Sequence, residues 1–438
     1  MKKVLFAFLA TGIMQLSSFA SGVMLARMLS PSLRGEVAQV IAWFGFIVPV
    51  MMLGINDSVA YFRSRNPAEG TAVLAGAFLL SVPFILVATL ICIAVILTIF
   101  STSSALAISG AWLFLFYAPF YQWQQIFYSY FQSGARPLVW TIARVLPGLV
   151  YISGLFLVWC SGHASPMNII AANVISLAVT LVVCAGIVWR SGEPFKMPGR
   201  ELIGRVFRFG LPVIFQRIAI VCRDNLDRMI LPFFVAASDL GYYVVAASIA
   251  YLIYVVGMSI DLVGFPAMAA VKDSDARRRL AELCISMTFF ILIILVTCFA
   301  FVIEPLVLLL FGKNYAVSTA LAPWFLIAGA AQALRIVVGG AFKAFNLSGQ
   351  MMRFEFVGSV IMLAVLVGAG AHFGVFAGVL AHIISAFISL AIALYGAVQT
   401  LKLSLRRMLL PSKSNIVLMW SILLRNFRPA DAPKGNPT

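Results

Sequence analysis

The stretch from Ala72 to Phe100 has the sequence AVLAGAFLLSVPFILVATLICIAVILTIF and contains no charged residue. About 20 apolar residues in an α-helix cross the roughly 30 Å hydrocarbon core of a bilayer, so this segment predicts a transmembrane helix. The whole chain has the same character, because 62% of its 438 residues are hydrophobic and only 11% are charged. Soluble domains are about 45–50% apolar and about 25% charged. The composition argues against a cytosolic enzyme, a nucleic-acid-binding module and a disordered chain.

Similar apolar runs recur along the chain, and together they number twelve. Lipid offers no hydrogen-bond partner, so a spanning segment must satisfy its own backbone polar groups, as a helix does. The sequence therefore predicts an all-α integral membrane protein with twelve transmembrane helices. The predicted spans lie near residues 4–28, 37–62, 72–100, 105–131, 138–160, 167–189, 207–233, 240–270, 283–311, 316–345, 354–371 and 374–400.

The basic residues indicate how these spans are oriented. The chain has 31 Lys and Arg residues against 15 Asp and Glu residues, a net charge of +16. If the N-terminus is cytoplasmic, the predicted outer segments hold only Arg27, Arg34 and Lys313, and the other basic residues between spans fall inside. Basic residues favour the cytoplasmic side of a membrane. We therefore expect both termini in the cytoplasm, and anionic membrane lipids rather than nucleic acid as partners of these charges.

A polar segment divides the spans into two groups of six. Residues 190–206 form a predicted cytoplasmic linker between an N-terminal lobe, residues 1–189, and a C-terminal lobe, residues 207–400. Residues 401–438 form a basic cytoplasmic tail. Because six is even, both lobes enter the membrane in the same direction, which predicts a pseudo-two-fold axis along the membrane normal. We expect the two lobes to enclose a central cavity.

The seventh predicted span, residues 207–233, differs from the others because it carries five charges. An Arg or Asp at the centre of a lipid-exposed helix costs about 2.5–3.5 kcal/mol. These side chains are therefore expected to face a water-filled cavity, the other lobe or each other. The charged residues are Arg217, Arg223, Asp224, Asp227 and Arg228.

Helical spacing suggests partners for four of these charges. Asp224 and Arg228 are four residues apart, with the acid before the base, which is the favourable order. Arg223 and Asp227 have the same spacing in the reverse order. Even if both pairs form, the span keeps one surplus positive charge.

Short motifs in both halves resemble those of a known family. They are Leu25-Ala26-Arg27-x-Leu29-Ser30-Pro31-x-x-x-Gly35, Gly210-Leu211-Pro212, Asp227-Arg228-x-x-Leu231 and Gly241-Tyr242-Tyr243. The chain resembles, over its whole length, the polysaccharide-biosynthesis membrane proteins. These are the O-antigen and exopolysaccharide flippases of the multidrug/oligosaccharidyl-lipid/polysaccharide exporter superfamily. The resemblance implies a bacterial inner-membrane protein that moves an undecaprenyl-pyrophosphate-linked glycan, with polysaccharide polymerase and export machinery as further partners.

Arginines in the spans fit such a substrate, because a guanidinium offers a planar set of donors to phosphate oxygens. Two of them, Arg144 in the fifth span and Arg335 in the tenth, have no acid within one helical turn. We therefore predict a cationic cavity that attracts the phosphates and sugar acids. Its predicted substrate-binding residues are Arg217, Arg223, Arg228, Arg144 and Arg335.

Four acids complete the predicted site. Asp224 and Asp227 are expected to orient the arginines of the seventh span, and Asp227 lies near its outer end, where water can reach it. Asp57 and Asp261 lie near the cytoplasmic ends of the second and eighth spans and are candidates for gating or proton sensing. The alternative is that these charges only form structural ion pairs. No cofactor or metal site is predicted, and coupling to protons or to sodium ions stays open.

The same features argue against other functions of a membrane protein. The chain has no G-x-x-x-x-G-K-[ST] motif, which argues against a nucleotide-driven pump. The absence of a long outer loop disfavours a membrane-embedded glycan polymerase. A multidrug or cation antiporter of the same superfamily is the alternative, which a net-positive cavity disfavours. The sequence therefore predicts a transporter, not an enzyme: a lipid-linked oligosaccharide flippase that works by alternating access.

Overall fold

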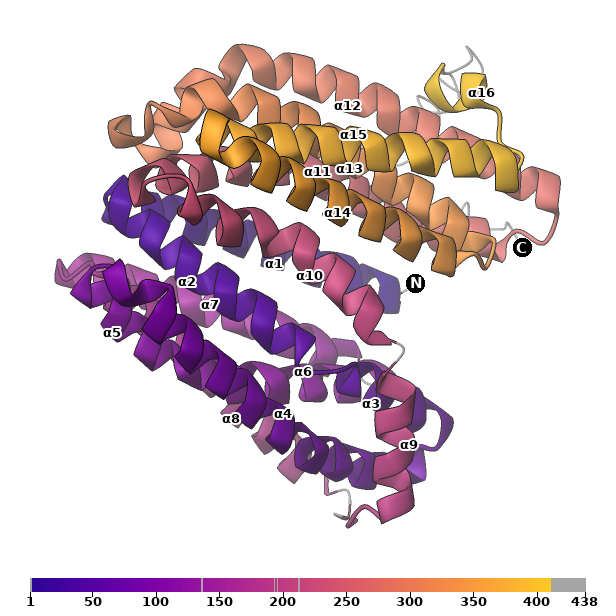
Figure 1. Ribbon diagram of the computed structural model, residues 1–438. Coiled ribbons are helices and arrows are strands. Elements are labelled where there is room, and N and C mark those ends of the chain that lie inside the picture. Colours follow the sequence, from indigo (N-terminus) through magenta and orange to yellow (C-terminus); the bar gives the residue numbers. More distant parts are fainter. Residues whose placement is uncertain (1, 135–136, 193, 195, 212, 411–438) are drawn as a thin grey trace, which may run out of the picture. The chain divides into compact units, whose positions relative to one another are not determined.

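The computed structural model describes residues 2–134, 137–192, 194, 196–211 and 213–410, and these residues form helices joined by short turns, without a strand. Figure 1 labels the helices in chain order. The first half contains α1 (Lys2–Met28), α2 (Pro31–Val50), α3 (Ile55–Arg65), α4 (Gly70–Thr98), α5 (Ala105–Leu113), α6 (Tyr117–Ser133), α7 (Pro137–Ser161) and α8 (Pro166–Arg190). The second half contains α9 (Arg200–Gly210), α10 (Val213–Ile230), α11 (Ala237–Ala270), α12 (Ser274–Phe311), α13 (Ser318–Ala344), α14 (Ser348–Phe373), α15 (Val375–Thr400) and α16 (Leu405–Leu409).

Five short 3₁₀ turns connect or extend these helices. They are η1 (Pro67–Glu69), η2 (Phe100–Thr102), η3 (Phe114–Phe116), η4 (Leu231–Phe233) and η5 (Lys313–Tyr315). Since η3 joins α5 directly to α6, the fourth predicted span is one nearly continuous rod.

The observed helices confirm the predicted all-α membrane fold. Within the described residues, ten helices are long and apolar enough to cross a membrane. Two further helices complete the predicted twelve. They are α1, which has 27 residues, and α10, which has 18 residues but is less apolar than the ten because it carries five charges. The chain is therefore a multi-pass membrane protein. Most of the predicted basic tail, residues 411–438, lies outside the described residues.

The second predicted span is not one helix over residues 37–62. It starts earlier, at Pro31, and breaks after Val50, and α3 resumes at Ile55. At the break, Leu53 and Gly54 have φ values of 48° and 69°, in the left-handed region that a continuous α-helix does not visit. A Cβ atom on Gly54 would lie 2.6 Å from the carbonyl oxygen of Gly210, so glycine is needed there for close packing as well as for its φ.

The seventh span also starts later than predicted. The predicted linker, residues 190–206, contains the start of α9, and this helix runs on to Gly210 before α10 begins at Val213. α9 is amphipathic: Leu202 and Val206 are buried, and it packs against α3 and α4. An amphipathic helix with a charged outer face buries one stripe on its neighbours and need not span the membrane.

The backbone groups into two compact units. The first comprises Met1–Ala250, Val302–Phe325 and Glu355–Ser385, and the second comprises Tyr251–Phe301, Leu326–Phe354 and Ala386–Thr438. These units do not follow the predicted lobes, residues 1–189 and residues 207–400, because α10 groups with the first-half helices. The division into two six-helix lobes with a cavity between them stays a prediction.

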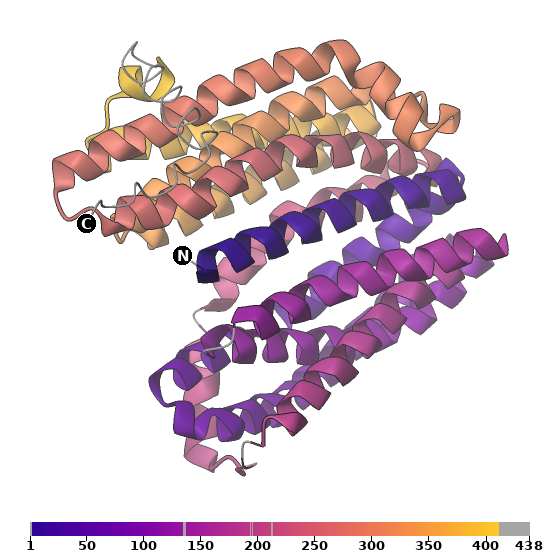
Figure 2. The same ribbon diagram turned by 180° about the vertical axis from the view of Figure 1, so that it is seen from behind.

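Packing in the first unit places α10 among the first-half helices. It lies along α2, while α1 lies beside α7 and α7 beside α8, as the front and back views show (Figures 1 and 2). A core of Phe44, Phe100 and Phe114 with their neighbours joins α2, α4 and α5. Where α2 and α10 meet, a Cβ atom on Gly45 would lie 3.3 Å from Oδ1 of Asn225, so a small residue lets the helices approach.

Two glycines join the starts of α2 and α11. A Cβ atom on Gly35 would overlap the carbonyl oxygen of Ala237, and a Cβ atom on Gly241 would overlap that of Pro31. Both glycines belong to the sequence motifs that suggested a family. The structure shows why the motif needs them: the two backbones meet directly, and a larger residue at either position would separate them.

Side-chain hydrogen bonds add to the backbone contacts near the start of α2. Arg27 at the end of α1 donates through Nε to the carbonyl oxygen of Leu310 at 2.9 Å and through Nη2 to that of Leu309, at the carboxyl end of α12. A cation is favourable there because the last carbonyls of a helix carry partial negative charge. The Tyr315 hydroxyl donates to the carbonyl oxygen of Leu29 at 3.1 Å. Burial raises the pKa of the Tyr315 phenol to about 12, so it keeps its proton at neutral pH.

Candidate functional site on the charged helix α10

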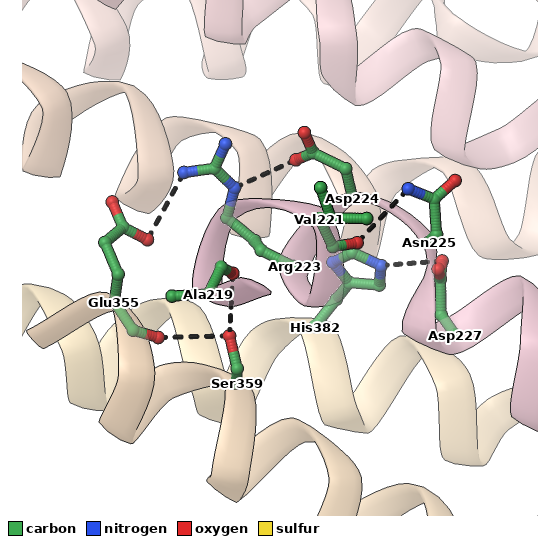
Figure 3. A network of polar contacts seen from close by, with 9 residues as sticks. All are labelled: Ala219, Val221, Arg223, Asp224, Asn225, Asp227, Glu355, Ser359 and His382. Atoms are coloured by element: carbon green, nitrogen blue, oxygen red, sulfur yellow. Dashed lines mark hydrogen bonds and ion pairs between the residues drawn. The ribbon is translucent and has the colours of Figure 1, made fainter. Parts of the chain in front are cut away.

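The candidate site is built on α10, which carries five charges and packs along α2. Other helices bring acids and a histidine to these charges, so the helix sits in a network of polar contacts. Figure 3 shows the part of this network that surrounds Arg223 and Asp227.

Arg217 and Asp57, two residues predicted for different roles, form one ion pair. Nη2 of Arg217 lies 3.1 Å from Oδ2 of Asp57 on α3. The side chains are 28% and 40% exposed, respectively, so the pair is partly open. Arg217 is therefore not the uncompensated cation that the sequence predicted.

Arg223 is held between two carboxylates. Its Nε lies 3.0 Å from Oδ1 of Asp224, and its Nη1 lies 3.2 Å from Oε2 of Glu355 on α14 (Figure 3). Its side chain is 20% exposed and that of Glu355 is 17% exposed, whereas that of Asp224 is 52% exposed. Ser359, one turn along α14, donates to the backbone carbonyl oxygens of Ala219 and Glu355 at 3.2 and 3.1 Å and ties α14 to α10.

Asp227 is the most buried acid of α10. It is 2% exposed, and its Oδ2 accepts hydrogen bonds from the Tyr243 hydroxyl on α11 at 2.7 Å and from Nε2 of His382 on α15 at 3.0 Å. Its Oδ1 is buried and has no hydrogen-bond partner in the described part of the chain. The expectation that water reaches Asp227 at an outer helix end was wrong, because α11 and α15 cover it.

The pairs predicted from helical spacing were also wrong. Asp224 pairs with its neighbour Arg223 and not with Arg228, and Asp227 pairs across helices with His382 and not with Arg223. Asp227 thus takes a partner on another helix, whereas two side chains one turn apart on the same helix gain only about 0.2–0.5 kcal/mol. Arg228 lies beside Asp227, and its Nε is buried without a hydrogen-bond partner among the described residues.

The net charge around α10 is negative rather than positive. Arg217, Arg223 and Arg228 are met by two acids of the helix itself and by two acids from α3 and α14, Asp57 and Glu355. The predicted positive surplus around this helix is therefore corrected: acids that are distant in sequence neutralise it. Four carboxylates and three guanidiniums leave the network one negative charge when His382 is neutral.

The other two predicted arginines lie elsewhere. The Arg144 guanidinium on α7 lies over the ring of Trp140, 4.8 Å from its centroid, one turn earlier on the same helix. Such a cation–π contact stabilises a guanidinium that has little access to water. Arg335 lies on α13 in the second unit and is 2% exposed. The structure therefore does not show the five arginines as one cluster.

Asp261, the remaining predicted acid, lies in the second unit. Its Oδ2 accepts a hydrogen bond from Nζ of Lys343 on α13 at 3.0 Å, and a Cβ atom on Gly340 would overlap its Oδ1. The glycine thus makes room for the carboxylate. A role for Asp261 in gating or proton sensing stays a prediction.

Four functional candidates were missed by reasoning from the sequence. They are Glu355, His382, Tyr243 and Lys343. Glu355 could have been found, because it is an acid inside the predicted eleventh span. His382 has no carboxylate near it in the sequence, so only the packing of α15 on α10 reveals its partner. Among the described residues, no group of three or more His, Cys, Asp or Glu side chains could hold a metal ion.

Solved structures with the same fold are transporters. An inward-facing multidrug resistance MATE family transporter of the MOP superfamily aligns with a TM-score of 0.72 and 15% identity over 89% of this chain and 95% of its own. The lipid II flippase MurJ, in an inward closed conformation, aligns with a TM-score of 0.70 and 14% identity over 97% and 94%. A MOP superfamily transporter from Pyrococcus furiosus Vc1, whose description reports a reversed polarity of its binding pocket, aligns with a TM-score of 0.61 and 15% identity over 92% and 95%. The fold is that of this superfamily.

Sequence comparison gives the family. No curated protein matches the chain. The family model described as "Polysaccharide biosynthesis protein" matches residues 1–272, a region that covers α1 to α11 and contains the whole of α10. The chain therefore belongs to the polysaccharide biosynthesis protein family.

Proposed function

We propose that this protein is a flippase that moves an undecaprenyl-pyrophosphate-linked oligosaccharide across the bacterial inner membrane by alternating access. The glycan would be an O-antigen, capsule or exopolysaccharide repeat unit. Family membership supports the polysaccharide role, and the fold shared with transporters supports translocation rather than enzymatic chemistry.

The observation that carries the proposal is the state of two arginines on a membrane-spanning helix. Arg217 and Arg223 are partly exposed, and each is held by a carboxylate from another helix. An arginine has five N–H donors, so the contact of Asp57 with Nη2 of Arg217 leaves donors on the other edge of that guanidinium for a phosphate. The acids stabilise the arginines when no substrate is bound, and the phosphates of the lipid carrier then add to or replace them.

A second candidate function is export of a cationic compound, as in multidrug transporters of this fold. The net negative charge of the α10 network favours it, because Asp224 is half exposed and could face a cation. The two functions predict opposite roles for the same helix: in a flippase the arginines bind the substrate, and in a cation exporter the acids bind it.

Transport by the purified protein in proteoliposomes separates the two. We expect outward movement of a fluorescent undecaprenyl-pyrophosphate-linked oligosaccharide, and we expect no transport of the cation ethidium. The Arg217→Ala variant should lower glycan flux roughly tenfold, since a hydrogen bond to a charged group contributes about 1.5–3 kcal/mol. The control is Arg200→Ala at the exposed start of α9, which should keep full flux. Ethidium flux that depends on Asp224, without glycan flux, would replace the proposal with the second function.

The proposed orientation has both termini in the cytoplasm, with the basic tail on anionic lipids of the inner leaflet. A polysaccharide polymerase and export machinery would receive the flipped unit. Green fluorescent protein fused to a cytoplasmic C-terminus should fluoresce, because this protein folds in the cytoplasm. It does not fold when it is exported across the membrane in unfolded form. A fluorescent fusion fits the proposed topology, and a dark fusion with normal amounts of protein contradicts it.

A further inference from the structure

The inference concerns a row of aromatic rings along η3 and α6. The rings of Phe114, Tyr117 and Tyr121 stack one turn after another, with neighbouring centroids 4.7 Å and 5.0 Å apart and interplanar angles of 29° and 25°. Phe114 is 1% exposed and belongs to the core, whereas Tyr121, at the other end of the stack, is only partly buried. The stack therefore leads from the core to an accessible tyrosine ring, and its packing fixes the plane of that ring.

Tyr121 lies beside the charged network of α10. It is close enough to Arg217 and Asp224 to interact electrostatically with both. In addition, α6 packs along α3, the helix that supplies Asp57 to Arg217. The side chains of Arg217, Asp57 and Asp224 are 28%, 40% and 52% exposed, respectively. The tyrosine ring thus borders the part of the network that is open.

The position of Tyr121 within its span argues against an ordinary interfacial tyrosine. The rod formed by α5, η3 and α6 runs from Ala105 to Ser133, and Tyr121 lies near its middle. Tyrosines that anchor a helix in the membrane lie near its ends, at the level of the lipid headgroups. A phenol at the middle of a span needs polar surroundings for its hydroxyl, and here the charged network provides them.

A second tyrosine continues the row toward α7. Tyr128 follows Tyr121 by seven residues and lies on the same face of α6, and it interacts electrostatically with both Tyr121 and Arg144. Gln124 lies between the two tyrosines on this face. It is 2% exposed, and its Nε2 has no hydrogen-bond partner in the described part of the chain. A buried amide donor without a partner is rare in folded proteins, so it marks a place where an acceptor can be added.

This arrangement fits a chain of sugar rings that begins at a phosphate. The C–H groups on one face of a sugar ring pack flat on an aromatic ring, whose face carries partial negative charge, and the hydroxyls need donors and acceptors beside it. In a lipid-linked glycan the first sugar is bonded directly to the diphosphate. A surface that binds this sugar must therefore lie next to the arginine that binds the phosphate, as Tyr121 lies next to Arg217.

We propose that Tyr121 and Tyr128 form a sugar-binding wall, in which Tyr121 stacks on the first sugar of the glycan while the diphosphate lies at Arg217. The glycan then continues along α6 to Tyr128 and Arg144, where a guanidinium can pair with an acidic sugar. This rests on the proposed function, because it takes a lipid-linked oligosaccharide as the ligand. It adds that the protein holds its substrate by the sugars as well as by the phosphates.

Binding of two probes to the full-length protein in nanodiscs tests the proposal. One probe is undecaprenyl pyrophosphate alone, and the other is undecaprenyl pyrophosphate carrying the repeat unit extracted from cells that make the protein. In the wild type, we expect the probe with the glycan to bind roughly tenfold more tightly, because ring stacking and apolar burial add to phosphate binding.

Tyr121→Leu removes the flat ring and keeps an apolar side chain. It should remove most of the difference between the probes and leave the affinity for undecaprenyl pyrophosphate alone unchanged. Tyr121→Phe keeps the ring and should keep the difference to within about twofold. Tyr395→Leu, at a tyrosine of α15 that is 67% exposed, is the matched control and should bind both probes as the wild type does.

Tyr128→Leu provides a second variant if Tyr121→Leu does not fold, and it should remove part of the same difference. An unchanged difference in both leucine variants, or an equal loss of affinity for both probes, would overturn the sugar-binding wall and leave the flippase proposal standing. Equal affinity of the wild type for the two probes would have the same consequence. If the wild type binds neither probe, the proposed substrate is wrong, and the wall falls with it.

Discussion

Asp57 on α3 accepts a hydrogen bond from Arg217 on α10 at 3.1 Å, and this pair joins the charged helix to the broken second span. α3 begins at Ile55, directly after the left-handed residues Leu53 and Gly54. The ion pair therefore links α10 to a short helix that starts at a break in the backbone. Helix breaks at membrane depth occur where transporters bind or release their cargo.

Asp57→Ala is expected to lower glycan flux about as much as Arg217→Ala, while the thermal unfolding midpoint hardly changes. The pair is partly exposed, and such pairs contribute only about 0–1 kcal/mol to stability. Flux in proteoliposomes and thermal unfolding in detergent measure the two effects separately. The charge-swapped double variant Asp57→Arg/Arg217→Asp should recover part of the flux, and a double variant no better than the single ones would show that the pairing itself is unimportant.

Glu355→Gln is expected to reduce stability more than Asp57→Ala does. The side chains of Glu355 and Arg223 are 17% and 20% exposed, and the change replaces one of the two carboxylates that hold Arg223 with a neutral amide. Loss of a charge-assisted hydrogen bond at such a position costs about 1.5–3 kcal/mol. Arg223→Lys should lower the thermal midpoint similarly, because a single ammonium group cannot replace a planar fork that reaches two acids. Unchanged midpoints in both variants would contradict this account.

The transmembrane helices were predictable because lipid imposes one simple rule on each segment alone. Any run of sufficient length and apolarity must form a helix, so the order and approximate bounds of the spans follow from composition. Even α10 was recognisable, since it has the length of a span and an apolar background between its charges. The break at Leu53 could not be recognised, because the sequence stays apolar through the left-handed turn. The two helices on either side of it therefore look like one continuous span.

The side-chain partners were not predictable because they depend on how helices pack. Asp57 and Arg217 are 160 residues apart in the chain, and His382 and Asp227 are 155 apart. Without these contacts, the arginines of α10 looked like a positive surplus, and the structure shows that acids from α3 and α14 offset it. Gly35 and Gly241 were visible as motif residues, but only the contact between α2 and α11 explains why their side chains must be absent.

Gly35→Ala is expected to destabilise the protein because the new methyl group would overlap the backbone of Ala237. Overpacking of this kind typically costs about 1–3 kcal/mol, and the starts of α2 and α11 would have to separate. Gly368→Ala on α14 is the matched control: it is exposed, a Cβ atom added there would meet no neighbouring group within 4 Å, and alanine should stabilise the helix by about 0.5–1 kcal/mol. Thermal unfolding should therefore shift in opposite directions, and a shift in the same direction would refute the packing argument.

Lys343→Met is expected to lower the thermal unfolding midpoint because it removes the amine that donates to Asp261, whose side chain is only 16% exposed. Lys343 itself is 42% exposed, so solvent weakens the pair and the loss should be about 1 kcal/mol. Adding Asp261→Asn to Lys343→Met removes the buried charge, and the double variant should recover more than half of the loss. Strictly additive losses would mean that the two residues act independently. If the double variant also transports glycan normally at pH 6 and pH 8, Asp261 has neither a gating nor a proton-sensing role, and the structural pairing with Lys343 accounts for its presence in α11.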